Sequence, residues 1–252
     1  MNDILKKRYT ELADRSFNTG TYTFTGFLGI ADRSDLYSME RELSYAGVSL
    51  YGGYDGADRV VARFGRSEEL GYEIEYPITC IHIVPLLKKF ADELNHRDFL
   101  GAIMNLGIER DTIGDIKVND REAYLLCLER IAPYIMENLT KIKHTNVKTS
   151  IISGFDKSKI VIFNEKPITK QITLSSLRVD GLISKVYNLS RNESLVLFQS
   201  QKVYVNGRLC ENNSAKIISG DVINARGYGK FAVCADPKMT RKGKLAVNVN
   251  IW

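Results

Sequence analysis

The chain has 252 residues, of which 44% are hydrophobic, and its net charge is +5 at pH 7. That length suffices for two or three small domains, each with a core of its own. No apolar run approaches the ~20 residues that a membrane-spanning helix needs, so the sequence predicts no membrane span.

The positive charge is concentrated in the last third of the chain. Residues 171–252 hold 12 Lys and Arg against 5 Asp and Glu, a net charge of +7, which leaves −2 for residues 1–170. A basic segment joined to a nearly neutral body is typical of a nucleic-acid-binding module.

The four cysteines are scattered singly, with no CxxC pair and no signal peptide. The sequence therefore predicts reduced thiols in the cytoplasm. Cys80 and His82 can face the same side of a strand, but two ligands do not make a zinc site. We expect no metal and no other cofactor.

Residues 1–58 are predicted to form a mainly helical N-terminal segment. Apolar residues at helical spacing indicate one helix over residues 1–15 and another over residues 32–46. Between them, residues 16–30 are rich in aromatic residues and glycine, which indicates a loop or an ordered arm.

The glycine-rich run at residues 52–59, GGYDGADR, invites comparison with a phosphate-binding loop. Such loops need a Gly-Lys-Ser or Gly-Lys-Thr sequence, or a place between a strand and the helix that it opens. Here the run precedes the strand-like residues 60–64, so a turn between elements is favoured. No glycine-rich methyl-donor signature follows a strand elsewhere, which weighs against an RNA methyltransferase.

Residues 59–152 are predicted to form one compact α/β unit. Its helices are expected at residues 96–107 and 131–142, and its strands at residues 60–64, 74–84, 113–118, 123–128 and 146–152. The order β-α-β-β-α-β predicts a ferredoxin-like domain, the arrangement that RNA-recognition motifs (RRMs) use. Pro77 indicates an edge strand or a bulge. Tyr124 is the only aromatic residue in its strand, so base stacking on this sheet is not predicted.

The run His96-Arg97-Asp98 resembles part of a kinase catalytic loop, but the downstream Asn and the Asp-Phe-Gly element are absent. On a helix His96 and Asp98 diverge by about 200°, which argues against joint acid–base catalysis. A structural role or a contact with RNA or a partner protein remains. The candidates for such a contact are His96, Arg97 and Arg110.

Residues 153–174 are predicted to be a linker or an edge strand, because the residue before Pro167 avoids the helical conformation. Residues 175–235 follow as a unit of two helices and short strands. The first helix is expected from Ser175 to Tyr187. The second begins at Ser190, which can form a capping box with Glu193.

A hairpin is predicted after these helices, because an alternating strand ends in Asn206-Gly207, a strong hairpin signal. Two further turns are expected at residues 219–221 and 226–230. Residues 236–252 are predicted to be a basic loop and a C-terminal strand of period two, which should pair with an existing sheet.

Residues 175–235 resemble the S4 domain, a small RNA-binding module. The likeness resides in short motifs at that family's spacing: Arg178-Val179-Asp180, Leu189-Ser190-Arg191, Lys202-Val203, Val205-Asn206-Gly207, Ser219-Gly220-Asp221 and Arg226-Gly227. The resemblance implies an RNA-binding face that comprises Arg178, Lys185, Ser190, Arg191, Lys202, Asn206, Arg226 and Lys230. The family usually has glycine where this chain has Gln201, which puts the left-handed end of the second helix in question.

The body of the chain resembles the YlmH-like family of bacterial S4-domain proteins. That likeness rests on the glycine-rich run, on the segment from His96 to Gly101, on Leu106-Gly107-Ile108-Glu109-Arg110 and on Ile113-Gly114-Asp115-Ile116. It implies an α+β chain with an N-terminal helical segment, an RRM-like central domain and a C-terminal S4 domain. The family is described as RNA-binding, has been linked to cell division, and is similar to S4 factors that act on obstructed large ribosomal subunits.

Two classes of function follow from these resemblances. The first is a non-enzymatic protein that binds structured RNA, ribosomal RNA or tRNA of the large ribosomal subunit, with division or ribosome-rescue proteins as further partners. The alternative is an RNA-modifying enzyme, such as a pseudouridine synthase, that uses the S4 domain as a targeting arm. Such an enzyme needs a buried aspartate beside an arginine, which the sequence does not reveal. A third hypothesis is a scaffold for division proteins.

Overall fold

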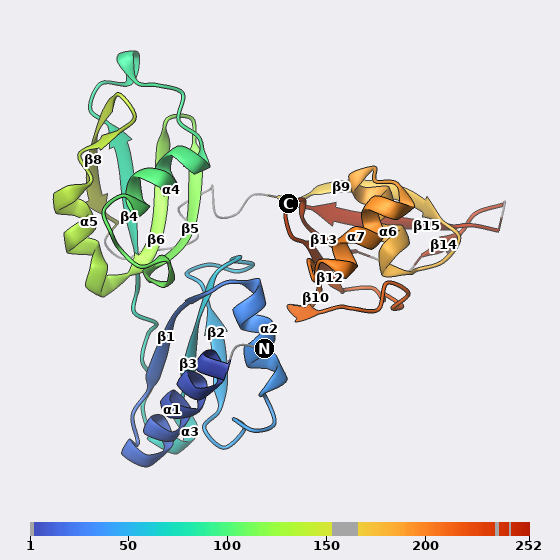
Figure 1. Ribbon diagram of the computed structural model, residues 1–252, viewed down its shortest axis with the longest axis horizontal. Helices are drawn as coiled ribbons and strands as arrows, with labels where there is room; N and C mark the ends of the chain where they lie inside the picture. Colours follow the sequence, from blue (N-terminus) through green and yellow to red (C-terminus); the bar gives the residue numbers. More distant parts are fainter. Residues whose placement is uncertain (1–2, 153–165, 235–236, 242) are drawn as a thin grey trace. The chain divides into compact units, whose positions relative to one another are not determined.

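A computed structural model describes residues 3–152, 166–234, 237–241 and 243–252 (Figure 1). The chain forms two compact units, Met1–Asn164 and Glu165–Trp252. Within the described residues, no helix has the length and apolar character that a membrane span requires.

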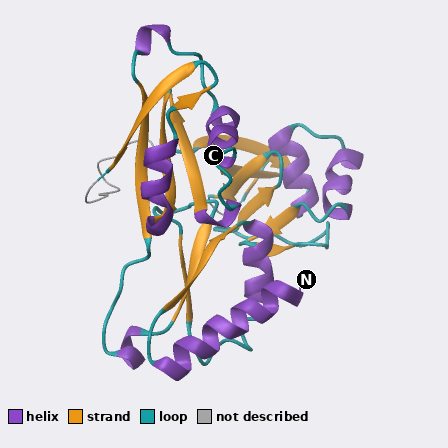
Figure 2. Cartoon of the chain, turned by 60° about the vertical axis from the view of Figure 1, so that its left-hand side comes forward, coloured by secondary structure: helices purple, strands orange, loops and turns teal. Residues whose placement is uncertain are grey.

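The N-terminal part of the first unit contains a three-stranded antiparallel sheet and is not mainly helical. Its elements are α1 (Asp3–Thr19), β1 (Thr23–Leu28), α2 (Ile30–Ser38), β2 (Val48–Tyr51), β3 (Val60–Phe64) and α3 (Ser67–Leu70). The strand order is β1-β3-β2, and α1 lies along this sheet (Figure 2). The predicted second helix is shorter than expected, because residues 39–46 form turns.

Strand β1 occupies a stretch for which the sequence predicts a loop or an arm. Gly26 in this strand lets Asp111 approach the backbone closely. A Cβ atom at this position would lie 2.6 Å from Oδ2 of Asp111. Residues 60–64, which the sequence assigns to the central domain, pair instead with β1 and β2. The predicted boundary after residue 58 is therefore wrong, since it separates strands of one sheet.

The central part of the first unit is a five-stranded sheet with the order β5-β6-β4-β8-β7. Its elements are β4 (Ile78–Pro85), α4 (His96–Met104), β5 (Ile113–Asn119), β6 (Glu122–Leu128), α5 (Ala132–Asn138), β7 (Lys141–Ile142) and β8 (Thr145–Ile151), with short 3-10 turns at Lys88–Phe90, Arg110–Thr112 and Glu129–Ile131. Strand β4 is paired on both sides, by β6 and β8. The prediction of an edge strand or bulge from Pro77 is wrong, because this proline lies just before β4.

The two faces of the central sheet pack against different elements. Ile81 and Leu125 share a core with residues of α4 and α5, which cover one face (Figure 1). Their neighbours Cys80 and Leu126 share a second core with Val61 of the N-terminal sheet. Because successive strand residues point to opposite faces, the N-terminal part covers a portion of the face opposite the helices.

The second unit combines two helices with a seven-stranded sheet. Its elements are β9 (Ile168–Leu174), α6 (Val179–Tyr187), α7 (Arg191–Gln199), β10 (Val203–Val205), β11 (Arg208–Leu209), β12 (Val222–Ala225), β13 (Gly229–Val233), β14 (Lys238–Met239) and β15 (Leu245–Ile251). Strand β15 pairs with β13 and, over its full length, with β9. The predicted C-terminal strand is thus confirmed. Of the linker or edge strand predicted at residues 153–174, residues 153–165 lie outside the described residues, and Ile168–Leu174 form β9.

Strands β9 and β15 belong to one sheet with the strands between them, although the sequence divides this region into three segments. Leu245 pairs with Leu174, and Ile251 pairs with Ile168. Both strands also contribute to the core beneath α6 and α7, through Ile172 and Val249. The compact unit therefore extends beyond the predicted residues 175–235.

The N-cap of helix α6 lies three residues later than predicted. Leu177 and Val179 are held as extended chain, because the Leu177 carbonyl accepts from Ile217 N and Val179 N donates to the Ala215 carbonyl. Arg178 rather than Ser175 therefore occupies the N-cap. Two other local predictions are confirmed. Ser190 caps α7 through a capping box. Asn206-Gly207 joins β10 to β11, with φ of 51° and 78°.

The end of α7 keeps the left-handed turn that the missing glycine puts in question. Gln201 has φ of 52°. Its N–H donates to the Phe198 carbonyl at 3.0 Å, and Lys202 N donates to the Leu197 carbonyl at 2.9 Å. These two bonds form a Schellman motif, which holds Gln201 in a conformation that side chains with a Cβ disfavour.

We expect Gln201→Gly to raise the free energy of unfolding of the second unit by about 0.5–1 kcal/mol. The change removes the left-handed strain of about 1–2 kcal/mol, and part of that gain is offset by the greater freedom of glycine in the unfolded chain. Trp252 is the only tryptophan, so its fluorescence during urea unfolding reports on this unit. Ser200→Gly is the matched control, because Ser200 has φ of −88°, and that variant should be destabilised.

Candidate nucleic-acid interface

Three of the predicted RNA-binding side chains meet at one open pocket of about 500 Å³ in the second unit. They are Arg178, Lys185 and Arg191, and Lys244 joins them from the turn before β15. We call this set of four cations the basic pocket. Of the residues that line it, Asp180 is the acidic one, so the pocket carries a net positive charge that suits a phosphate backbone.

The start of α7 positions Arg191 at the rim of the basic pocket. Ser190 Oγ accepts from Glu193 N at 3.2 Å, and Glu193 Oε2 accepts from Ser190 N at 2.7 Å. These hydrogen bonds lower the pKa of Glu193. They also place Arg191 as the first residue of the helix. The Ser190 side chain, a predicted RNA contact, is thus engaged within the protein.

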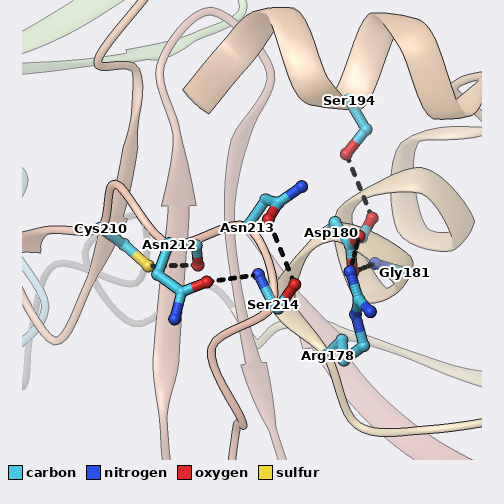
Figure 3. Close-up of polar contacts among 8 residues, drawn as sticks. All are labelled: Arg178, Asp180, Gly181, Ser194, Cys210, Asn212, Asn213 and Ser214. Carbon is cyan, nitrogen blue, oxygen red and sulfur yellow. Dashed lines mark hydrogen bonds and ion pairs between the residues drawn. The ribbon is translucent and has the colours of Figure 1, made fainter. Parts of the chain in front are cut away.

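Asp180, in the first turn of α6, orients Arg178 at the start of the same helix. Its carboxylate accepts from Arg178 Nε at 3.1 Å, from Arg178 Nη2 at 2.8 Å and from Gly181 N at 2.8 Å. Ser194 Oγ of α7 donates to the Asp180 carbonyl at 3.1 Å and so ties the two helices together (Figure 3). These contacts give Asp180 a structural role. The Arg178 side chain remains 46% exposed.

The loop after β11 is hydrogen-bonded to the first turn of α6. Asp180 N donates to the Asn213 carbonyl at 3.2 Å. The loop is itself closed by a bond from Ser214 N to Asn212 Oδ1 at 2.9 Å and by one from Ser214 Oγ to Asn213 Oδ1 (Figure 3). The first turn of α6 is therefore fixed before any ligand arrives.

Lys244 is the member of the basic pocket that the sequence did not single out. It precedes Leu245, which pairs with Leu174 at the end of β9. This pairing brings Lys244 to the residues that lead into α6. The basic composition of residues 237–244 was a visible signal, but its target depends on a strand pairing across about seventy residues of chain.

The remaining predicted RNA-binding residues do not line the basic pocket. Lys202 and Arg226 are neighbours at one end of β10 and β12, where Arg226 N donates to the Lys202 carbonyl at 2.8 Å. Lys230 lies on β13 opposite Asn224. These three cations remain candidates for a second group of phosphate contacts, separate from the first.

Both the nitrogen and the oxygen of the Asn206 side-chain amide form hydrogen bonds within the protein. Its Nδ2 donates to Asp221 Oδ1 at 2.8 Å, and its Oδ1 accepts from Val222 N at 2.9 Å. Asp221 Oδ2 in turn accepts from Ile218 N. The structure therefore gives Asn206 a role in fixing the β10–β11 turn against β12.

The candidates in the central domain separate into two places. His96 and Arg110 lie in the same charged neighbourhood, where partial desolvation and the nearby Arg110 lower the pKa of His96. Burial and the charge of Arg59 lower the pKa of Arg110 to about 10, and its guanidinium donates to the Ile113 carbonyl at 2.6 Å. Arg97 is exposed at another pocket, on the side of Lys143.

The glycine-rich run is a turn, as predicted, and it donates hydrogen bonds to the partly buried carboxylate of Asp115. Asp115 accepts from Tyr54 Oη at 2.8 Å, from Asp58 N at 2.8 Å and from Arg59 N at 3.1 Å. The Arg59 guanidinium donates to the carbonyls of Phe27 and Ile113, at 2.6 and 2.9 Å. These residues, which we call the Asp115 network, join the N-terminal sheet to β5.

The four cysteines are free, and burial raises the pKa of Cys80 and of Cys127 to about 12. Among the described residues, no group of three or more His, Cys, Asp or Glu side chains is placed to hold a metal ion.

Comparisons with known proteins found a matching family model, a similar sequence and a similar fold. Residues 72–154 match a family model described as "Putative RNA-binding domain in YlmH". The chain is 27% identical over 204 residues to the "Ribosome-associated protein quality control protein P2" of Bacillus subtilis (strain 168), covering 80% of this chain and 76% of that protein. The solved structure "Cell division protein ylmH from Streptococcus pneumoniae" has a similar fold, with a TM-score of 0.51 at 18% identity, over 63% of this chain and 93% of that chain. The matched segment and the Bacillus relative make this chain similar to the YlmH-like family.

Proposed function

We propose that the protein is a non-enzymatic RNA-binding factor that acts on structured RNA of the large ribosomal subunit, either ribosomal RNA or tRNA. The observation that carries this proposal is the convergence of Arg178, Lys185, Arg191 and Lys244 on one pocket. Cations grouped on a rigid surface neutralise several phosphates of a folded RNA at once. The similarity to a ribosome-associated quality control protein favours the ribosome as the source of that RNA and the cytoplasm as the place of action.

The arrangement of both units supports the domain types that the sequence predicts. In the second unit, α6 and α7 precede the β10–β11 hairpin and β12, as in an S4 domain, and here α7 begins with a basic residue. In the first unit, the strand order β5-β6-β4-β8 is the order expected of an RRM-like sheet. We propose these assignments for the two units.

The partly buried Asp115 beside Arg59 invites comparison with the aspartate of a pseudouridine synthase. Its two oxygens accept three hydrogen bonds from the protein itself, and burial raises its pKa. A nucleophile must instead reach its substrate with a free oxygen. The Asp115 network therefore favours a structural role, and with it the non-enzymatic function.

The proposal predicts that Arg191→Ala lowers the salt dependence of RNA binding without unfolding the protein. Each phosphate contact contributes ~0.7 to 0.9 to the slope of log affinity against log salt. We expect that loss when the binding of large-subunit RNA is measured between low and moderate salt. Lys202→Ala, which changes the second group, should lower the slope by a similar amount.

Arg41→Ala is a suitable control, because Arg41 is exposed in the N-terminal part and carries the same charge. If the slope for Arg191→Ala equals that of the intact protein, the basic pocket does not contact phosphates and the proposal fails.

A further inference from the structure

Strand β1 is an outer strand of the N-terminal sheet (Figure 1). Among the described residues, its one strand partner is β3. Six consecutive residues of the chain at this strand, residues 21–26, line an open cavity of about 550 Å³, which we call the β1 groove. The outer edge of a strand presents backbone N–H and C=O groups at the spacing of a further strand, about 3.3 Å per residue.

Helix α1 and the residues after β6 complete the lining of the β1 groove. The helix contributes side chains at spacings of four and three residues, which place them on one face of the helix: Arg8, Leu12 and Arg15. Thr23 Oγ1 donates to the Leu12 carbonyl at 2.7 Å and so fixes α1 against the strand. Glu129 N donates to the Pro77 carbonyl at 3.0 Å. The groove is therefore built from elements that are already tied together.

The β1 groove carries a net positive charge. Arg8, Arg15 and Arg130 line it, and all three are exposed. Of the described residues that line the groove, Glu129 is the acidic one. Arg8 is partly engaged, because its Nη1 atom lies 3.6 Å from Oδ2 of Asp111. Guanidinium groups of this kind bind carboxylates through paired hydrogen bonds, so the groove favours an acidic ligand.

The lining of the β1 groove matches a polypeptide better than a nucleic acid. A strand edge pairs with a second polypeptide through a regular series of N–H and C=O groups, which the sugar-phosphate backbone of RNA lacks. Apolar side chains also line the groove, among them Leu12, Phe24 and Leu128. They can contact every second side chain of an added strand, while the arginines contact its carboxylates. An extended acidic peptide meets all of these features.

We infer that the β1 groove binds an extended, acidic segment of a partner protein, which adds to β1 as a further strand. Main-chain hydrogen bonds supply the affinity, and the three arginines select for acidic side chains. This site goes beyond the proposed function, because it binds protein and lies in the first unit, whereas the basic pocket lies in the second. The sequence does not indicate it, since residues 16–30 are predicted to be a loop or an arm.

The test is the fluorescence anisotropy of a labelled peptide of alternating Glu and Val, titrated with the full-length protein. We expect saturable binding. Replacing Arg15 and Arg130 together by alanine should weaken it by about tenfold, because two exposed ion pairs are lost. Replacing Arg41 and Lys148 by alanine is the matched control, because both are exposed and neither lines the groove. A peptide of alternating Lys and Val should not bind.

Hydrogen exchange separates strand addition from simple charge attraction. The backbone amides of residues 21–25 should exchange more slowly when the Glu-Val peptide is bound. Those of β2, the other outer strand of the same sheet, should exchange at an unchanged rate. The same peptide with N-methylated backbone amides cannot donate main-chain hydrogen bonds, so it should bind more weakly by about tenfold.

Three results would overturn the inference. The first is that the intact protein does not bind the Glu-Val peptide, and the second is that residues 21–25 exchange at the same rate with and without it. The third is equal protection of residues 21–25 by polyuridylate, which would make the groove an RNA site. The alanine variant of Arg178, Lys185 and Arg191 should bind the peptide like the intact protein, which separates this inference from the proposed function.

Discussion

Replacing Arg178, Lys185 and Arg191 together by alanine is expected to weaken binding to large ribosomal subunits by about 100-fold near 0.15 M salt. Each lost phosphate contact lowers the salt slope by about 0.8, which corresponds to about fivefold at that salt relative to 1 M. Three contacts from one pocket multiply to about 100-fold when they act independently. Co-sedimentation with purified large subunits over a range of salt concentrations measures both the affinity and the slope.

The control for this triple variant must remove the same charge elsewhere. Replacing Lys7, Arg15 and Arg41 by alanine does so, because all three are exposed in the N-terminal part, and both variants change the net charge from +5 to +2. We expect the control to lose less than about threefold, the effect of net charge alone. Equal losses in the two variants would show that the basic pocket has no special role.

Asp115→Ala is expected to lower the free energy of unfolding of the first unit by about 3 kcal/mol. The change leaves Tyr54 Oη, Asp58 N and Arg59 N without their acceptor, and each unsatisfied buried donor costs about 1–3 kcal/mol before relaxation. It also removes a negative charge that acts on the half-buried Arg59 guanidinium.

Two signals assign this loss to the first unit. Urea unfolding followed by circular dichroism reports on both units, whereas the fluorescence of Trp252 reports on the second. The dichroism transition of the first unit should move to lower urea, and the Trp252 transition should not move. Asp115→Asn should cost less, because the amide oxygen still accepts one of the three bonds. A loss below about 1 kcal/mol for Asp115→Ala would show that the Asp115 network does not hold the unit together.

Local signals in the sequence predicted much of the second unit. The capping box of Ser190 and the Asn206-Gly207 turn depend on residues within four positions of each other, so their geometry follows from short-range hydrogen bonds and backbone preferences. A cap of equally short range begins α4 in the first unit, where Asn95 accepts from Arg97 N and Asp98 N. The sequence also showed Gln201 at a position where glycine is usual. It did not show that the left-handed turn persists there, because the turn is held by hydrogen bonds of the surrounding backbone.

Features that depend on distant pairing were missed. Strand β1 was mistaken for a loop because its glycine suggests flexibility, whereas its role is the close approach of Asp111. Lys244 reaches the basic pocket only through the register of β15 with β9. Periodicity along one segment contains no information about which strands become neighbours.

The most direct test of the central claim is crosslinking with sequencing in growing cells, comparing the intact protein with the alanine variant of Arg178, Lys185 and Arg191. We predict that crosslinks of the intact protein gather on one region of large-subunit ribosomal RNA and on tRNA, and that the variant loses them. If the variant keeps those crosslinks, the basic pocket is not the RNA-binding surface. If instead the crosslinks centre on one nucleotide that is chemically altered only when the protein is present, the protein is an RNA-modifying enzyme.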